Sequence, residues 1–255
     1  MLLVVDVGNT QTHFGTFRGE ELVEHWRFAT VRTSTADELG AALRNLLELR
    51  GVGLADLSAS IVSSTVPQLE PEWVAVGERY LGHRMLAVGP GLRTGMQIRI
   101  DNPRELGADR IVNAVAAHDQ LGGPCVAVDF GTATTFDVVN AAGEYEGGVI
   151  MPGMEISLDA LTSRGAKLPR LELTAPKQTI GKGTVDAIRA GMIFGYAAAI
   201  DGVVARIRGE LGDPQVPSIA TGGLASTVVP HTEQIDGLDD LLTLKGLKLL
   251  HERNA

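Results

Sequence analysis

Cysteine, aromatic residues and long apolar runs are all scarce in this sequence. A single cysteine, Cys125, occurs among 255 residues, which excludes an internal disulfide and a cysteine-based metal site. Its apolar neighbours favour a buried, inert thiol over a nucleophile. Aromatic side chains make up 4% of the chain, too few for a base-stacking surface. Apolar runs such as residues 2–5 are too short to span a bilayer. We therefore expect neither a membrane nor a nucleic acid as partner.

Positive charge is also in deficit. The chain carries 22 Lys and Arg against 31 Asp and Glu, a net charge of −9, so attraction to a nucleic-acid backbone is not expected. Backbone N–H groups and a metal ion can still bind an anionic nucleotide. The first residues lack a basic leader and a cleavage site, and together with the lone thiol this predicts a cytoplasmic location.

The patterns that are present predict an α/β protein. Hydrophobic residues make up 44% of the chain, enough for a proper core. Short apolar segments, and alternation at residues 21–29, predict strands at residues 2–7, 12–17, 21–29, 60–64 and 85–88. Helical periodicity predicts helices at residues 35–51, 69–81 and 104–119, the first opened by a capping box of Thr35 and Glu38.

Near residue 120 the pattern starts again. Strands are expected at residues 125–128, 134–139 and 145–151, and the first of them ends in Asp129 as the N-terminal strand ends in Asp6. Repetition of a hairpin with an acidic residue at the same turn indicates two copies of one fold. We expect one domain over residues 1–119 and a second over residues 120–255.

The second half continues with further predicted elements. Helices are expected at residues 154–163, 184–208 and 242–252, a strand at 216–220, and a loop near Pro169 and Pro176. We expect the long helix to be amphipathic, so that Gly191 and Gly195, spaced four apart, pack closely against a neighbour.

The two aspartate turns have the composition of a phosphate cradle. Glycine lets backbone N–H groups approach a phosphate without a Cβ in the way, and short polar side chains can donate to its oxygens. Residues 6–10 and 129–134 supply both, and the carboxylates of Asp6 and Asp129 could hold a cation or its waters. An ordinary hairpin turn favours the same residues, but two copies in matching halves favour the cradle. Residues 221–223 form a weaker third loop, since Gly-Gly also simply ends strands.

This arrangement resembles the acetate kinase, sugar kinase, Hsp70 and actin superfamily, and within it type III pantothenate kinase. The resemblance extends over essentially the whole chain and rests on Asp6-Val7-Gly8-Asn9-Thr10, Asp101-Asn102-Pro103-Arg104-Glu105-Leu106-Gly107-Ala108-Asp109-Arg110, Asp129-Phe130-Gly131-Thr132-Ala133-Thr134-Thr135, Gly147-Gly148-Val149-Ile150-Met151-Pro152-Gly153, Gly183-Thr184 with Ala187-Ile188, and Leu242-Thr243-Leu244-Lys245-Gly246-Leu247.

The resemblance implies two duplicated RNase H-like (actin-like ATPase) domains with a nucleotide cleft between them. It implies phosphorylation of pantothenate by ATP with Mg²⁺, the first step of coenzyme A synthesis. It also implies a monovalent cation, K⁺ or NH₄⁺, at Asp129, and a homodimer with the long helix of residues 184–208 at the interface.

The same resemblance assigns the site residues. Asp109 is implied as the general base. ATP is implied to contact Asp6, Val7, Gly8, Asn9, Thr10, Gln11, Thr12, His13, Gly131, Thr132, Gly222 and Gly223. Pantothenate is implied to contact Ile100, Gly107, Ala108, Asp109, Arg110 and Thr184.

Two of these residues have alternative roles. Asp109 could instead be a surface residue of a helix, paired with Arg110 or Arg104, and Thr184 could be the N-cap of the long helix. Arg110 suits the carboxylate of a substrate because a guanidinium binds it through two parallel hydrogen bonds. The chain also departs from the family pattern, with Ile100 where an aromatic residue is common and Gly183 where asparagine is common.

Three other functions remain open. Another kinase or phosphatase of the superfamily would share the nucleotide loops, although residues 107–110 disfavour it. A non-enzymatic regulator could dispense with Asp6, Asp109 and Asp129, yet all three are present. An actin-like filament protein usually needs a longer chain.

Overall fold

The computed structural model describes residues 1–164 and 171–255, so the loop expected at Pro169 lies outside the described residues. These residues form two compact units. The first comprises Met1–Gly95, Asn102–Ala116 and Thr243–Ala255, and the second comprises Met96–Asp101 and Ala117–Leu242. The expected boundary between residues 119 and 120 lies beside the border at Ala116. A single boundary would place Met96–Asp101 in the first domain and Thr243–Ala255 in the second. In the structure Met96–Asp101 belongs to the second unit and Thr243–Ala255 to the first.

The first unit is built on a five-stranded sheet in the order β3-β2-β1-β4-β5. Its strands are β1 (Leu2–Val7), β2 (Gln11–Arg18), β3 (Glu21–Ala29), β4 (Ala59–Ser64) and β5 (Leu86–Ala87). The strands β1, β2 and β3 form an antiparallel meander, and β4 and β5 continue the sheet in parallel. The strands expected from the sequence are therefore confirmed.

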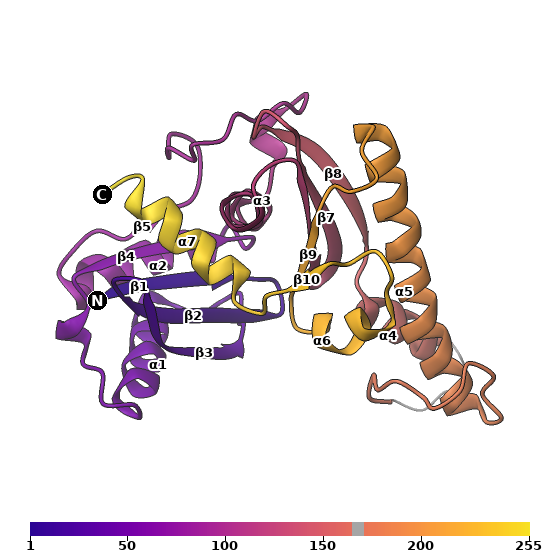
Figure 1. The fold of residues 1–255 in the computed structure, drawn as a ribbon. Coiled ribbons are helices and arrows are strands. Elements are labelled where there is room, and N and C mark those ends of the chain that lie inside the picture. The colour runs from indigo at the N-terminus through magenta and orange to yellow at the C-terminus, as the bar shows by residue number, and fades with distance from the viewer. Residues whose placement is uncertain (165–170) are drawn as a thin grey trace. The chain divides into compact units, whose positions relative to one another are not determined.

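Helices cover both faces of this sheet (Figure 1). Helix α1 (Ala36–Glu48) begins with the predicted Thr35–Glu38 capping box, and with α2 (Leu69–Val76) it packs on a core that includes Leu3, Val5 and Trp73. On the other face lies α7 (Leu242–Glu252), where a Cβ at Gly15 would be 3.1 Å from Leu244 Cδ1. The same strand β1 thus has Leu3 and Val5 on the α1 side and Asp6 on the α7 side.

The second unit repeats this sheet. Its strands are β6 (Cys125–Phe130), β7 (Ala133–Val139), β8 (Tyr145–Pro152), β9 (Ser218–Thr221) and β10 (Gly237–Leu238), in the order β8-β7-β6-β9-β10. The pairings match as well, since β6–β7 and β7–β8 are antiparallel whereas β6–β9 and β9–β10 are parallel. Two copies of one α/β arrangement confirm the duplicated fold.

Helix α5 (Thr184–Leu211) is the main cover of the second sheet. Ile193, Ile200 and Val204 are fully buried in a core with Val128 and Phe136, while α4 (Met154–Arg164) packs nearby. The expected amphipathic character is wrong, because the exposed side carries small rather than charged residues. By length and apolar composition α5 could also cross a membrane, and its buried side packs on the second sheet.

Helix α3 (Ala108–Leu121) begins four residues later than expected. Asn102 caps a short 3₁₀ turn at Pro103–Glu105, and an extended Leu106 separates this turn from the helix. Helix α2 gives way to a π-helical turn at Gly77–Leu81. The 3₁₀ turns Leu54–Asp56 and Val229–His231 and the short α6 (Ala225–Val228) complete the described elements.

Candidate active site

The first aspartate turn joins β1 to β2 through a glycine that has no room for a side chain. Gly8 N–H donates to the carbonyl oxygen of Gln11 at 3.0 Å, and a Cβ on Gly8 would lie 2.9 Å from that oxygen. Asn9, Thr10 and Gln11 are exposed around the tip. The turn therefore presents backbone and short polar groups to solvent, as a phosphate site requires.

A cation that the sequence did not single out lies beside this turn. Arg32 Nη2 donates to Asn9 Oδ1 at 3.1 Å, and Asn9 Nδ2 donates to Thr65 Oγ1 at 3.4 Å. Arg32 follows β3, far from the motif in sequence, so no local signal could have found it. Its positive charge suits a phosphate at the exposed tip.

The remaining residues assigned to this turn are less accessible. Val7 and Thr12 are buried, so their side chains belong to the core. His13 stands opposite Asp6 in the sheet, and its Nε2 lies 3.1 Å from His25 Nδ1. Burial, Arg27 and His25 lower the pKa of His13 to about 3. His13 is therefore neutral at physiological pH and brings no positive charge to a nucleotide.

The second aspartate turn is enclosed by two further loops. Gly131 N–H donates to Ala133 O at 3.1 Å, and Gly153 N–H donates to Thr132 O at 3.1 Å. A Cβ on Gly153 would lie 2.6 Å from Gly131 O. Gly153, which follows β8, thus holds the turn by close backbone contact. It ends the motif of residues 147–153, which alone gives no indication of this role.

The Gly222 loop meets the same turn from β9. Asp129 pairs with Thr221 across the parallel strands, and Gly222 follows with φ of +98°. A Cβ on Gly222 would lie 2.5 Å from Asp129 Oδ1 and 2.6 Å from Phe130 N. The predicted third loop is therefore next to Asp129, with Gly223 immediately after it.

The surroundings of the two aspartates correspond position by position. Asp6 lies between His13 on β2 and Ser63 on β4, and Asp129 lies between Thr135 on β7 and Thr221 on β9. On the neighbouring parallel strand, each aspartate thus pairs with a residue that has a hydroxyl side chain. This agreement supports two copies of one turn more strongly than the local sequence does.

Asp109 lies in the first turn of α3. A Cβ on Gly107 would lie 2.6 Å from Asp109 Oδ1, so the carboxylate folds back over the start of the helix. Burial raises the pKa of Asp109, against the backbone hydrogen bond and the positive charge of Arg110. The side chain is partly buried, which disagrees with a simple surface residue.

The other residues assigned to pantothenate are divided between the units. Gly107, Ala108, Asp109 and Arg110 belong to the first unit, whereas Ile100 and Thr184 belong to the second. Ile100 is partly buried, with Cγ2 3.8 Å from a Cβ built on Gly147. Thr184 is exposed and is the first residue of α5, whose N-cap is Gly183. The alternative of Thr184 as N-cap is wrong, because Gly183 occupies that position.

Comparisons with known proteins identify the family of the chain. The family model for type III pantothenate kinase matches residues 2–206. The type III pantothenate kinase of Moorella thermoacetica is 48% identical over 255 residues, all of both chains. That of Streptomyces avermitilis is 51% identical over 261 residues, covering all of this chain and 98% of the relative.

Solved structures with low identity share the fold. A protein named as a Baf family transcriptional activator from Campylobacter jejuni has a TM-score of 0.60 at 17% identity, covering 99% of this chain and 98% of its own. Component A of the (R)-2-hydroxyglutaryl-CoA dehydratase of Acidaminococcus fermentans has a TM-score of 0.57 at 16% identity, covering 100% and 96%. These likenesses concern the fold alone. On its sequence, the chain belongs to the type III pantothenate kinase family.

Proposed function

We propose that this protein transfers the γ-phosphoryl group of ATP to the primary hydroxyl of pantothenate, with Asp109 as the general base. The observation that carries the proposal is the carboxylate of Asp109, which burial shifts to a raised pKa at a helix start. A base with a pKa closer to neutrality accepts a hydroxyl proton more readily. The family supplies the identity of the acceptor.

The two aspartate turns provide the nucleotide half of the reaction. Phosphoryl transfer depends mainly on positioning and charge neutralisation. The glycine turns at Gly8 and Gly131 offer backbone N–H groups to the phosphates, and Arg32 adds a positive charge. Mg²⁺ would accompany ATP and neutralise phosphate charge, and Asp6 and Asp129 would offer carboxylate oxygens to the ion or to its waters.

A monovalent cation, K⁺ or NH₄⁺, fits the Asp129 turn. Asp129 is half-buried, and its Oδ1 would lie 2.5 Å from a Cβ built on Gly222 and 3.7 Å from one built on Gly131. A carboxylate oxygen suits a hard cation. We expect activity with K⁺ to exceed activity with Na⁺, and this difference to disappear in Asp129→Asn together with most of the activity.

Arg110 is proposed to bind the carboxylate of pantothenate, while Ile100 and Thr184 contact the rest of the substrate. Ile100 cannot donate a hydrogen bond where relatives commonly have an aromatic residue. If that residue is tyrosine and makes one ordinary hydrogen bond, its loss would weaken binding by about 0.5–1.5 kcal/mol.

Product identification tests the proposed reaction. Purified protein is incubated with ATP, Mg²⁺ and K⁺, with either pantothenate or glucose as acceptor, and the products are identified by mass spectrometry. We expect phosphopantothenate and no sugar phosphate. A phosphorylated sugar would indicate a sibling kinase, and ATP binding without any product would indicate the regulator that the name of the Campylobacter structure suggests.

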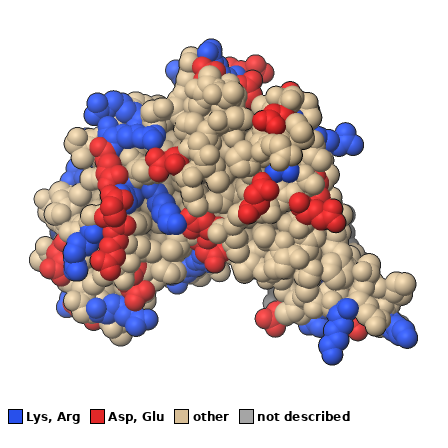
Figure 2. Space-filling model, in the orientation of Figure 1, with Lys and Arg blue, Asp and Glu red and all other residues tan. Residues whose placement is uncertain are grey.

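The exposed side of α5 is proposed as the contact of a homodimer. It carries Ala187, Gly191, Gly195, Ala198, Gly202 and Ala205. Among the described residues, none lies within 4 Å of a Cβ built on Gly191, Gly195 or Gly202. Few charged side chains lie over α5 in the view of Figure 2. Small residues allow two helices to approach closely.

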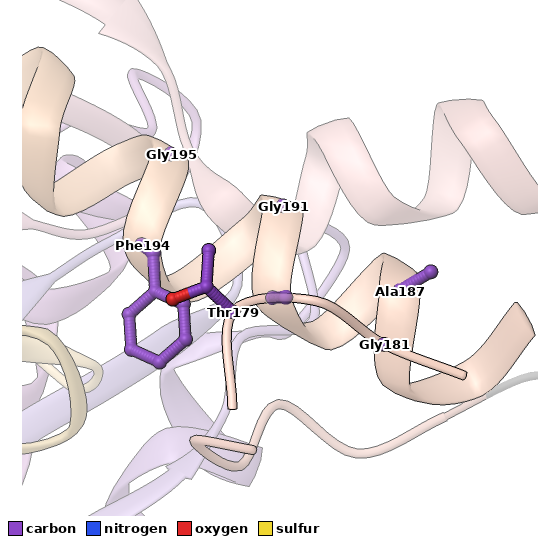
Figure 3. Close-up of a pocket in the computed structure, with 7 residues that line it drawn as sticks. Thr179, Gly181, Ala187, Gly191, Phe194 and Gly195 are labelled. Carbon is purple, nitrogen blue, oxygen red and sulfur yellow. The ribbon is translucent and has the colours of Figure 1, made fainter. Parts of the chain in front are cut away.

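A hollow of about 470 Å³ lies at the N-terminal end of this face. In Figure 3 the chain at Thr179 and Gly181 runs over α5 beside Gly191, Phe194 and Gly195. A protruding side chain of a second copy could fill it. We expect Gly195→Lys to convert a dimer to a monomer in light scattering, and Ala141→Lys, on an exposed turn, to leave the dimer intact; a dimer in both variants would contradict this interface.

We further propose a cytoplasmic location.

A further inference from the structure

The segment Met96–Asp101 is attached to the start of β8 by the backbone of one residue, Tyr145. Tyr145 N–H donates to Gln97 O at 2.8 Å, and Arg99 N–H donates to Tyr145 O at 2.8 Å. Ile98 thereby forms a parallel bridge with Tyr145. The segment contains no helix, so these bonds fix its register against the second sheet.

An ion pair holds the same segment from the solvent side. Arg99 Nη2 lies 2.7 Å from Glu144 Oε1, and the Glu144 side chain is only 18% exposed. Asn140 Nδ2 donates to the other Glu144 oxygen at 3.0 Å. The hydrogen bonds of Arg99 and Asn140 lower the pKa of Glu144, so the pair stays charged at neutral pH.

Tyr145 is anchored from the inside of the sheet. Its side chain is fully buried, as is Asp137, and its hydroxyl donates to Asp137 Oδ1 at 2.8 Å. Thr135 Oγ1 lies 3.4 Å from Asp137 Oδ2. A register shift in the β7–β8 pairing, between Val138 and Val139, accompanies Tyr145. A buried carboxylate bonded in this way resists displacement, because leaving it without its partners is expensive.

This anchor links two parts of the proposed site. Thr135 pairs across the strands with Asp129, at the proposed cation turn. At the other end, the segment that Tyr145 holds carries Ile100, one residue beyond Arg99 and two before the chain enters the first unit at Asn102. The position of Ile100 therefore depends on Tyr145.

We propose that Tyr145, held by Asp137, is a positioning residue that fixes Ile100 and the adjoining chain for the acceptor substrate. This inference rests on the proposed function, in which Ile100 contacts pantothenate. It predicts a larger effect on the acceptor than on ATP, since Tyr145 belongs to none of the three nucleotide loops and reaches the Asp129 turn only through Asp137 and Thr135.

The test is Tyr145→Phe, which removes one oxygen and keeps the ring. We expect the KM for pantothenate to rise about three- to tenfold, as loss of one hydrogen bond allows, and the KM for ATP to stay within about twofold. Hydrogen exchange at the Arg99 amide should quicken. The matched control is Tyr80→Phe, because Tyr80 donates to Asp37 at 2.5 Å on the exposed surface of the first unit, and it should change neither KM.

A second variant covers a folding failure of the first. Arg99→Gln breaks the ion pair with Glu144 and leaves the buried Tyr145 unchanged, so it should raise the KM for pantothenate and not the KM for ATP. Its control is Arg44→Gln, which breaks the exposed ion pair with Glu48. An unchanged pantothenate KM in the folded variants, or an equal rise for both substrates, would overturn the inference. If the wild type fails to phosphorylate pantothenate, the proposed function is wrong, and exchange at Arg99 still decides whether Tyr145 holds the segment.

Discussion

Replacing Gly222 by alanine adds one methyl group to the loop that follows β9. With φ of +98°, the new residue would adopt a conformation that costs a residue with a Cβ roughly 1–2 kcal/mol. The methyl carbon would also lie 2.5 Å from Asp129 Oδ1 and 2.6 Å from Phe130 N. The clash with backbone cannot be relieved by rotating a side chain, so overpacking adds about 1–3 kcal/mol.

These two terms predict a loss of about 2–5 kcal/mol in the free energy of unfolding, or roughly 4–20 °C in Tm for a chain of this size. Because the methyl group also displaces the Asp129 carboxylate, ATP should bind more weakly. Thermal unfolding followed by circular dichroism and calorimetric titration of ATP measure both effects.

The control makes the same chemical change in open space. Gly209 lies in α5, and no atom of residues 1–164 or 171–255 lies within 4 Å of an added Cβ, so Gly209→Ala should stabilise the helix by about 0.5–1 kcal/mol. A Gly222→Ala protein with the Tm and ATP affinity of the wild type would refute the reasoning.

Three further predictions concern other parts of the chain. His13 has a folded-state pKa of about 3, below the unfolded value near 6.5, so the unfolded chain binds more protons between these two pH values. The free energy of unfolding therefore falls as pH drops from 6.5 toward 3, by at most about 1.4 kcal/mol per pH unit. Chemical denaturation at several pH values should show a shallower dependence of the free energy of unfolding on pH for His13→Gln, and equal dependences would contradict this prediction. The buried Arg208 donates to Val216 O, Gln234 Oε1 and Asp236 Oδ2, so Arg208→Met should lower the free energy of unfolding by about 2–4 kcal/mol. The control Arg206→Met, at an exposed position of the same helix, should change it by less than about 0.5 kcal/mol. Equal effects of the two substitutions would contradict a stabilising role of the Arg208 hydrogen bonds. Burial raises the pKa of Cys125 to about 12, so a thiol reagent should label it only after unfolding, and rapid labelling of the native protein would show the thiol to be accessible.

The sequence was sufficient for the parts of the fold that local pattern determines. Short apolar runs located the strands β1 and β6, and the capping box at Thr35 located the start of α1. The repeated aspartate turn predicted the duplication, which the matching strand order of the two sheets confirms.

Other features depend on tertiary contacts that no local pattern reports. Helical periodicity extended α3 back to Arg104, but Pro103 and the Asn102 cap favour a separate turn there. The helix α7 was assigned to the second half by its place in sequence, yet Gly15 and Val112 pack against it in the first unit. The short strand β10 has two residues, too few for any periodicity.

The candidate site likewise contains residues that the sequence identified and residues that it did not. Motifs identified the glycine turns and Asp109, because glycine and an acidic residue at such positions leave a readable pattern. Arg32, Gly153 and Tyr145 were missed, because each acts through a residue distant in sequence. The low pKa of His13 likewise follows from burial and from Arg27 and His25 on β3.

The most direct test of the central claim compares Asp109→Asn with the wild type in pantothenate-dependent ADP formation, with ATP affinity measured on the same samples. Asp37→Asn, an exposed acid in the first turn of α1, is the control. We predict that Asp109→Asn lowers kcat by about 10²- to 10⁴-fold, with the Kd for ATP within about twofold of the wild type. An Asp109→Asn protein that phosphorylates pantothenate at the wild-type rate would contradict Asp109 as the base.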